Sequence, residues 1–87
     1  MGKSDLPHPR TYVGKYVVWN RNTKVQRIVG FSRWAEEDGH FHPQMWVAEV
    51  GVGNKYEISL RALQHKFAWF DALANAKAHA KFNERYW

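Results

Sequence analysis

The chain has 87 residues, of which 45% are hydrophobic and 24% charged, a composition that fits one folded domain and excludes a disordered chain. It contains no cysteine, which excludes disulfides, thiol nucleophiles and cysteine-based zinc sites, and which fits a cytoplasmic location. The net charge of +5 favours an acidic partner, either nucleic acid or an acidic protein surface, and no apolar run is long enough for a membrane helix.

The first ten residues are expected to form a flexible arm. Pro7 and Pro9 interrupt any regular element, and the residues around them are polar. Lys3 and Arg10 add positive charge, so such an arm can touch phosphates, although most chain ends of this kind are disordered. Residues 11–87 are then expected to form one small domain, a β-sheet followed by a C-terminal helix.

Residues 11–60 are rich in β-branched and aromatic side chains, which favour strands. Four strands are predicted, over residues 12–19, 25–34, 44–52 and 55–59. Turn-forming residues separate them at 20–23, 36–39 and 51–54. Sequential strands with short connections predict a curved antiparallel meander, and Gly30 within the second strand predicts a bulge or a bend.

The last part of the chain, residues 60–87, is predicted to be helical. Ser59 can cap a short turn over residues 60–64, and a longer helix is predicted over 67–85, where Ala, Lys and Leu are frequent. The large apolar residues at the start of this helix are expected to pack on the sheet. They are Phe67, Trp69, Phe70 and Leu73. The predicted fold class is therefore α+β, with a curved antiparallel sheet of four strands and a C-terminal α-helix.

The strand segments have the lengths and glycine positions of a known small barrel. Over residues 12–63 the chain resembles an SH3-like small barrel of the Tudor or KOW kind. The segments that carry the resemblance are 13–18, 27–31, 45–50 and 56–60. It implies a second strand bent at its glycine, a short helical turn before a closing fifth strand, and binding of nucleic acids, peptides or methylated side chains.

The predicted long helix occupies the place of that fifth strand. The sheet is therefore expected to be an open barrel or to be closed by residues near Tyr12. A plain sheet of three or four strands with one helix packed on it is the alternative.

Basic residues alternate with aromatic ones on the predicted strands and follow one line along the predicted helix. Strict alternation places Arg27, Phe31 and Arg33 on one face, whereas a bulge at Gly30 would regroup them. On the helix, three cations recur at the spacing i, i+4, i+8. The candidate binding residues are Lys15, Arg27, Arg33, Trp34, Lys77, Lys81 and Arg85.

Rings that stack on bases, together with cations that contact phosphates, are what nucleic-acid binding with little base specificity requires. We therefore interpret the chain as a DNA-binding or RNA-binding module. The alternative is that the basic surface only keeps the protein soluble and binds no specific partner.

A second hypothesis belongs to a different class. The chain is also suited to act as a protein-binding inhibitor or adaptor, for example a virus-encoded protein that docks on a host enzyme. Exposed Trp and Arg are favoured anchors of protein interfaces, and a basic helix can compete for a nucleic-acid partner.

Two further arrangements would recognise small cations. Converging rings beside Glu49 could hold a methylated ammonium group. The rings available for such a cage are those of Tyr16, Trp19, Trp34 and Trp46. His40 and His42 point to the same side of an extended segment and could contribute to a metal site, but a polar loop is the usual outcome.

The run Glu36–Glu37–Asp38 is the one concentrated acidic segment, and we expect it at a hairpin tip. It could pair with a basic patch of another copy of the chain, which would give a homodimer or a head-to-tail contact. Serine occurs only at positions 4, 32 and 59, none of them in a nucleophile-elbow setting, and there is no glycine-rich phosphate loop. We expect no enzymatic activity and no cofactor.

Overall fold

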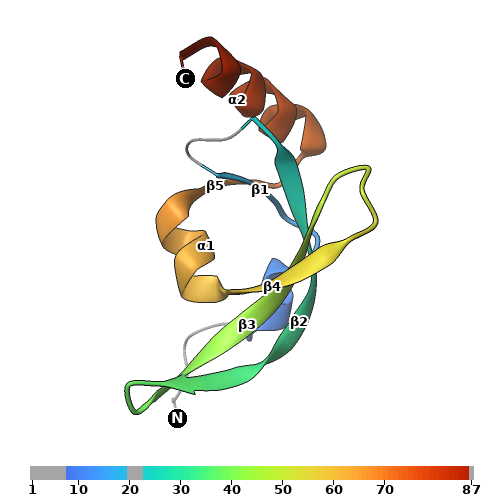
Figure 1. Cartoon of the computed structure of the whole chain (residues 1–87). Helices are drawn as coiled ribbons and strands as arrows, with labels where there is room; N and C mark the ends of the chain where they lie inside the picture. Colours follow the sequence, from blue (N-terminus) through green and yellow to red (C-terminus); the bar gives the residue numbers. More distant parts are fainter. Residues whose placement is uncertain (1–7, 20–22, 87) are drawn as a thin grey trace.

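The computed structural model describes residues 8–19 and 23–86. The five strands form one antiparallel sheet in the order β4-β3-β2-β1-β5, accompanied by two α-helices (Figure 1). The elements in chain order are the 3-10 helix η1 (Pro9–Tyr12), β1 (Tyr16–Trp19), β2 (Val25–Glu37), β3 (His40–Glu49), β4 (Lys55–Ser59), α1 (Leu60–Lys66), β5 (Phe67–Phe70) and α2 (Leu73–Tyr86). The prediction of an α+β fold with an antiparallel sheet is confirmed. Residues 1–7 of the predicted arm and 20–22 of the first predicted turn lie outside the described residues.

The prediction of one long helix from residue 67 is wrong at its start, because Phe67–Phe70 form a fifth strand. This strand pairs with β1, with Phe67 opposite Trp19 and Trp69 opposite Val17. Trp69 packs on one side of the sheet and Phe70 on the other, so this strand contributes a large apolar side chain to the core on each face. A run of four apolar residues has no periodicity that separates strand from helix, and pairing with β1 decides the outcome.

β2 is bent by two irregularities in its pairing with β3. The register shifts between Ile28 and Gly30, next to the glycine where a bulge was predicted, and again between Phe31 and Arg33. Each shift turns the following residues to the other face of the sheet. Arg33 therefore stays on the face of Arg27, opposite Gln44, whereas Phe31 lies opposite Met45 on the other face. The expectation that Phe31 shares a face with both arginines is wrong.

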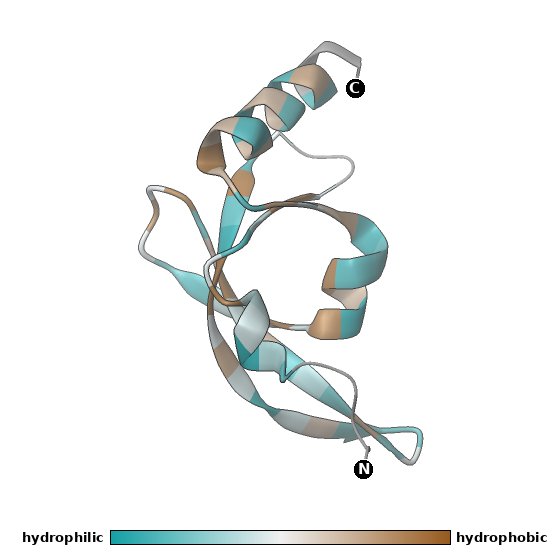
Figure 2. Ribbon diagram, turned by 180° about the vertical axis from the view of Figure 1, so that it is seen from behind, coloured by the Kyte–Doolittle hydropathy of each residue, from teal (hydrophilic) through white to brown (hydrophobic). Residues whose placement is uncertain are grey.

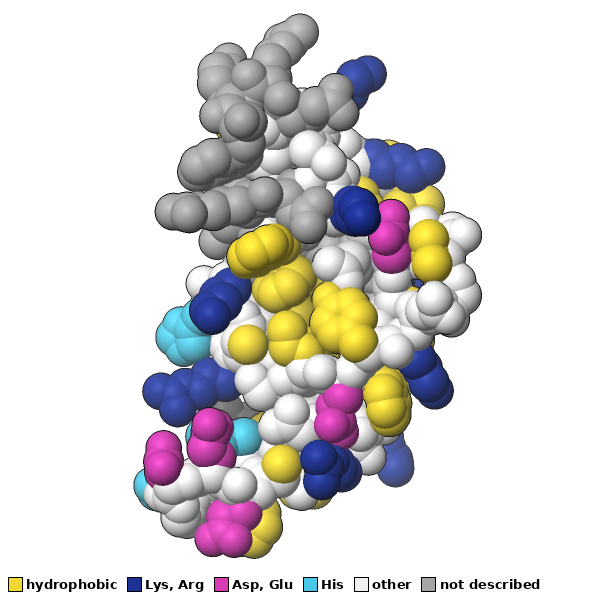
Figure 3. Space-filling model, viewed as in Figure 1, with side chains coloured by type: hydrophobic (Ala, Val, Ile, Leu, Met, Phe, Trp, Pro, Cys, Tyr) yellow, Lys and Arg dark blue, Asp and Glu magenta, His cyan; other side chains and the backbone are white. Residues whose placement is uncertain are grey.

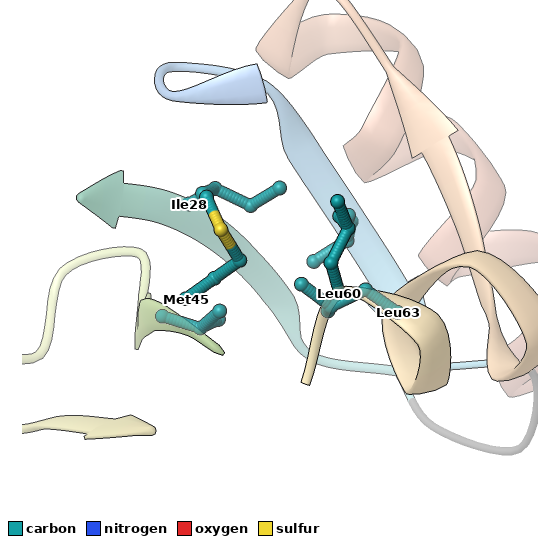
Figure 4. Packing of buried hydrophobic residues seen from close by; sticks show 6 residues of the cluster. Ile28, Met45, Leu60 and Leu63 are labelled. Atoms are coloured by element: carbon teal, nitrogen blue, oxygen red, sulfur yellow. The ribbon is translucent and has the colours of Figure 1, made fainter. Parts of the chain in front are cut away.

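The concave side of the sheet, here called the inner face, holds the main core. Val17, Ile28, Met45 and Val47 are buried there against two leucines of α1 (Figure 4). Those leucines are Leu60 and Leu63. In Figures 1 and 2, α1 lies within the curve of the sheet, so it fills the side that the strands leave open.

The position of α1 is fixed at both ends by hydrogen bonds. The Ser59 Oγ atom accepts a hydrogen bond from the backbone N–H of Ala62 at 3.1 Å, which confirms the predicted cap. The indole Nε1 of Trp69 donates to the carbonyl oxygen of Leu63 at 2.8 Å. The first bond caps the start of the helix, and the second ties its last turn to β5.

The opposite, outer face is covered by α2 at one end only. Val18 is buried there against Ala76 and Ala80, and the small alanines let the helix approach the sheet closely. Tyr16, Val25 and Phe70 pack around this cluster. α2 spans 14 residues, and within the described part of the chain no helix is both long and apolar enough to cross a membrane.

β2 and β3 extend beyond the other strands as a two-stranded ribbon, here called the hairpin arm (residues 33–44). β4 pairs with β3 only from Gln44 onward. The turn at the tip places both Asp38 (φ 53°) and Gly39 (φ 79°) in the left-handed region, as a two-residue turn that matches the strand twist requires. The molecule measures 45 × 25 × 22 Å, with the arm and α2 at opposite ends (Figure 1).

Candidate nucleic-acid interface

The uncovered part of the outer face carries two cation–ring pairs. The guanidinium carbon of Arg27 lies 5.9 Å from the centroid of the Tyr16 ring. The Nζ atom of Lys55 lies 4.8 Å from the Trp46 ring. Strand register sets both pairs, because Tyr16 lies opposite Arg27, and Trp46 is two residues from Ala48, the partner of Lys55, on the same face. Each ring holds its cation in place by cation–π attraction.

A shallow groove of about 250 Å³ adjoins the first pair. Its walls are Tyr16, Arg27, Val29, Ala48 and the β3–β4 turn at residues 49–52. Val29 is the extra residue of the first bulge and remains 41% exposed. The groove therefore joins apolar surface to a guanidinium group, although Glu49, which pairs with Lys24 at 3.9 Å, also lines it.

A second groove, here called the α2 groove, lies between α2 and the start of β2. Its volume is about 270 Å³, and it is lined by Thr23, Val25, Lys77, Ala80 and Lys81. Lys77 and Lys81 are one helical turn apart, so their side chains lie on the same side of α2. Val25 precedes Arg27 by two residues on β2, about 7 Å along the strand and on the same face. The two lysines of α2 and Arg27 thus belong to one continuous surface.

Two of the predicted binding residues are held in ion pairs. The Nζ atom of Lys15 lies 2.5 Å from the Asp71 carboxylate, and the Nε atom of Arg33 lies 3.0 Å from that of Glu57. The Ser32 hydroxyl donates to the same Glu57 oxygen at 2.5 Å. Hydrogen bonds from Arg33 and Ser32 hold the pKa of Glu57 below its ordinary value, so the carboxylate stays charged and offsets Arg33. These two cations add less positive potential to the surface than their number suggests.

Because the pKa of Glu57 is lower in the folded than in the unfolded chain, its contribution to stability is present above the unfolded pKa and disappears as the pH falls through the folded value. Replacing Glu57 by Gln is expected to lower the melting temperature modestly at about pH 7 and to have little effect at about pH 3. Thermal unfolding followed by circular dichroism at both pH values checks this. Glu37→Gln on the hairpin arm, where no ion pair with a described residue occurs, is the matched control. An effect of Glu57→Gln that is equal at both pH values would contradict the assignment.

Of the remaining predicted site residues, Trp34 is not part of this surface. Trp34 lies opposite Pro43 on the inner side of the hairpin arm, with its ring 6.4 Å from His8 and 5.9 Å from Phe31. The side chain of Arg85 lies outside the described part of the structure. The structure therefore brings together Arg27, Lys77 and Lys81.

The rings considered for an aromatic cage are divided between the two faces. Tyr16 and Trp46 lie on the outer face, whereas Trp19 and Trp34 lie on the inner side, opposite Phe67 and Pro43. His40 and His42 share one side of the arm, but among residues 8–19 and 23–86 no three His, Asp or Glu side chains gather closely enough to hold a metal ion. The described residues therefore form neither the aromatic cage nor the metal site considered above.

Lys55 is a residue of this surface that the sequence interpretation missed. A signal existed, because the predicted strands 44–52 and 55–59 form a hairpin that places residue 55 near Trp46. The Lys55 side chain then covers the ring from the neighbouring strand. For this contact, the pairing of the predicted strands indicates the cation–ring pair, whereas the positions of Lys55 and Trp46 along the sequence do not.

The surface combines flat rings, apolar grooves and four cations, and none of these cations pairs with an acidic side chain of the described residues. The four are Arg27, Lys55, Lys77 and Lys81. Such a surface can hold an anionic ligand that also presents flat or apolar groups. Comparison of the chain with protein-family models, with curated proteins and with solved structures finds no match.

Proposed function

We propose that this protein is a non-enzymatic nucleic-acid-binding module with little base specificity, and that it binds through the outer face of the sheet and the adjoining side of α2. The observation that carries the proposal is the continuous surface formed by Arg27, Lys77 and Lys81 beside the Tyr16 ring. Phosphates spaced along a strand match cations spaced along a surface, and a base can stack on a guanidinium group such as that of Arg27, which lies over the Tyr16 ring. The described residues of this surface do not form a fixed set of donors and acceptors for reading base edges, which is why low specificity is proposed.

We also propose that the sheet is an SH3-like small barrel of the Tudor or KOW kind. Support comes from the strand order β4-β3-β2-β1-β5, from the long bent β2, and from a helical segment, α1, between β4 and the last strand. Barrels of this kind often bind nucleic acids, peptides or methylated side chains. This adds weight to the functional proposal by analogy of fold alone.

Titration of a fluorescent single-stranded oligonucleotide with the protein, followed by anisotropy, tests the proposal. The slope of log K against log salt is expected to be about −2 to −3, which corresponds to three or four phosphate contacts at about −0.7 each on a single strand. The affinity should then fall by roughly 20- to 60-fold between about 50 and about 200 mM salt. Parallel titrations with RNA and with duplex DNA rank the substrates. Absence of binding at the lower salt concentration, or a slope near zero, would contradict the proposal.

A protein-binding adaptor or inhibitor is the second candidate, and one observation favours it. Trp34 is 50% exposed and Phe41 is 66% exposed on the hairpin arm, far from the basic surface. Exposed aromatic side chains of this size are common anchors of protein interfaces. A single protein captured from cell extract that is retained after nuclease treatment, and lost with Trp34→Ala, would favour this candidate over nucleic-acid binding.

A further inference from the structure

The hairpin arm presents an exposed aromatic face, although one side of the Trp34 ring contacts His8 and Phe31. Trp34 lies opposite Pro43, and Glu36 lies opposite Phe41, so these four side chains share one side of the ribbon. Trp34 and Phe41 are the two exposed rings on it. The tight turn at Asp38 and Gly39 fixes the geometry of the tip, so little ordering would be needed on binding.

Charge indicates what this face can contact. Residues 34–54 contain no Lys or Arg, so all 13 Lys and Arg residues of the chain lie outside this segment. The tip carries Glu36, Glu37 and Asp38 in succession, and in Figure 3 acidic side chains gather at the lower end of the molecule. The partner surface must therefore be basic and must offer an apolar recess for a ring.

The α2 groove of the same chain has both properties. Val25 and Ala80 provide apolar walls, and Lys77 and Lys81 lie at its edge. Its volume of about 270 Å³ lies just below the ~300–1,000 Å³ of pockets for small ligands, which suits a single side chain. The groove beside Tyr16 and Arg27 fits an acidic arm less well, because Glu49 lines it.

We infer that the hairpin arm of one copy of this chain docks into the α2 groove of a second copy, with Trp34 in the groove and Glu36, on the same side of the ribbon, near Lys77 and Lys81. The arm and α2 lie at opposite ends of the molecule in both views of the chain, so the arm does not reach the groove of its own copy (Figures 1 and 2). The two surfaces differ, so the contact is head-to-tail and either extends or closes into a ring. This inference does not depend on the proposed function.

Charge reversal in two separate proteins tests the contact. One variant carries Glu36→Lys and Glu37→Lys, which leaves the Asp38–Gly39 turn intact, and the other carries Lys77→Glu and Lys81→Glu. Sedimentation velocity at low salt, on protein free of nucleic acid, measures the weight-average mass over a range of concentrations. The natural protein is expected to associate as its concentration rises and to dissociate when salt is added. Each variant alone should remain monomeric, because its arm and its groove then carry the same sign of charge.

An equimolar mixture of the two variants is expected to associate again, since the reversed arm of one protein complements the reversed groove of the other. Trp34→Ala should weaken self-association at least about tenfold, whereas Trp19→Ala, which removes an exposed Trp outside the arm, should leave it unchanged. Circular dichroism of each variant reports whether it is folded. The inference is overturned if the natural protein remains monomeric at every concentration. It is also overturned if folded charge-reversed variants associate on their own, or if their mixture fails to associate.

These outcomes are separable from those of the proposed function. Glu36→Lys, Glu37→Lys and Trp34→Ala change the arm, which is not part of the basic surface. The variants that carry these substitutions should therefore still bind an oligonucleotide as monomers. Loss of self-association with oligonucleotide binding retained would support the contact alone. Oligonucleotide binding by a natural protein that never self-associates would support the proposed function alone.

Discussion

Replacing Leu63 by Ala is expected to lower the free energy of unfolding by about 2–5 kcal/mol. Leu63 is fully buried and lies with Ile28 and Met45 in the core of the inner face. Its removal leaves a cavity between α1 and the sheet, and the surrounding strands are too constrained by their pairing to close it. Ala is a slightly better helix former than Leu, so the loss would come from packing and not from helix propensity.

Chemical denaturation by urea measures this effect, with Arg61→Ala as the matched control on the exposed side of the same helix. Small domains have a total stability of about 5–15 kcal/mol, so the Leu63 substitution should remove a large share of it, while the control should change it by less than about 0.5 kcal/mol. A shift of the urea midpoint with an unchanged slope would show lost stability without a change in the unfolded state. Equal, small effects of the two substitutions would mean that α1 does not close the core.

Much of the sheet could be predicted because its strands follow local rules. The fourth strand has the predicted bounds, since Gly51 and Gly53 mark the turn before it and Ser59 caps the helix after it. These features depend on a few neighbouring residues, which is the range over which sequence patterns are informative.

The remainder depends on contacts between distant residues. Phe67–Phe70 form a strand only because β1 offers them a free edge about 50 residues earlier in the chain. The second bulge, at Ser32, contains no glycine, so no residue in the sequence predicts it. It nevertheless places Phe31 and Arg33 on different faces of the sheet. The candidate site could be predicted only in part, because its ion pairs also depend on contacts between distant residues. The sequence identified Arg27, Lys77 and Lys81 as candidate cations. It did not reveal that Lys15 pairs with Asp71 and Arg33 with Glu57, because these partners are 56 and 24 residues away in the chain.

The second large effect is expected from reversing three charges of the proposed interface. The triple variant Arg27→Glu, Lys77→Glu, Lys81→Glu should lower the affinity for a single-stranded oligonucleotide at least about hundredfold at low salt and should reduce the salt slope by about 2. Each of these side chains is proposed to neutralise one phosphate, and a carboxylate in its place repels that phosphate. None of the three is buried, so the fold should be retained.

A second triple variant separates local contacts from overall charge. Arg10→Glu, Arg61→Glu and Lys66→Glu also take the formal net charge from +5 to −1, but these residues lie on η1 and α1, away from the outer face. Long-range attraction responds equally to both variants, and it weakens within about 10 Å at ~0.1 M salt. If the outer face is the interface, the first variant should lose far more affinity than the second, and the difference should persist as salt is added. Equal losses would show that the oligonucleotide senses only the net charge, and the interface would then lie elsewhere on the molecule.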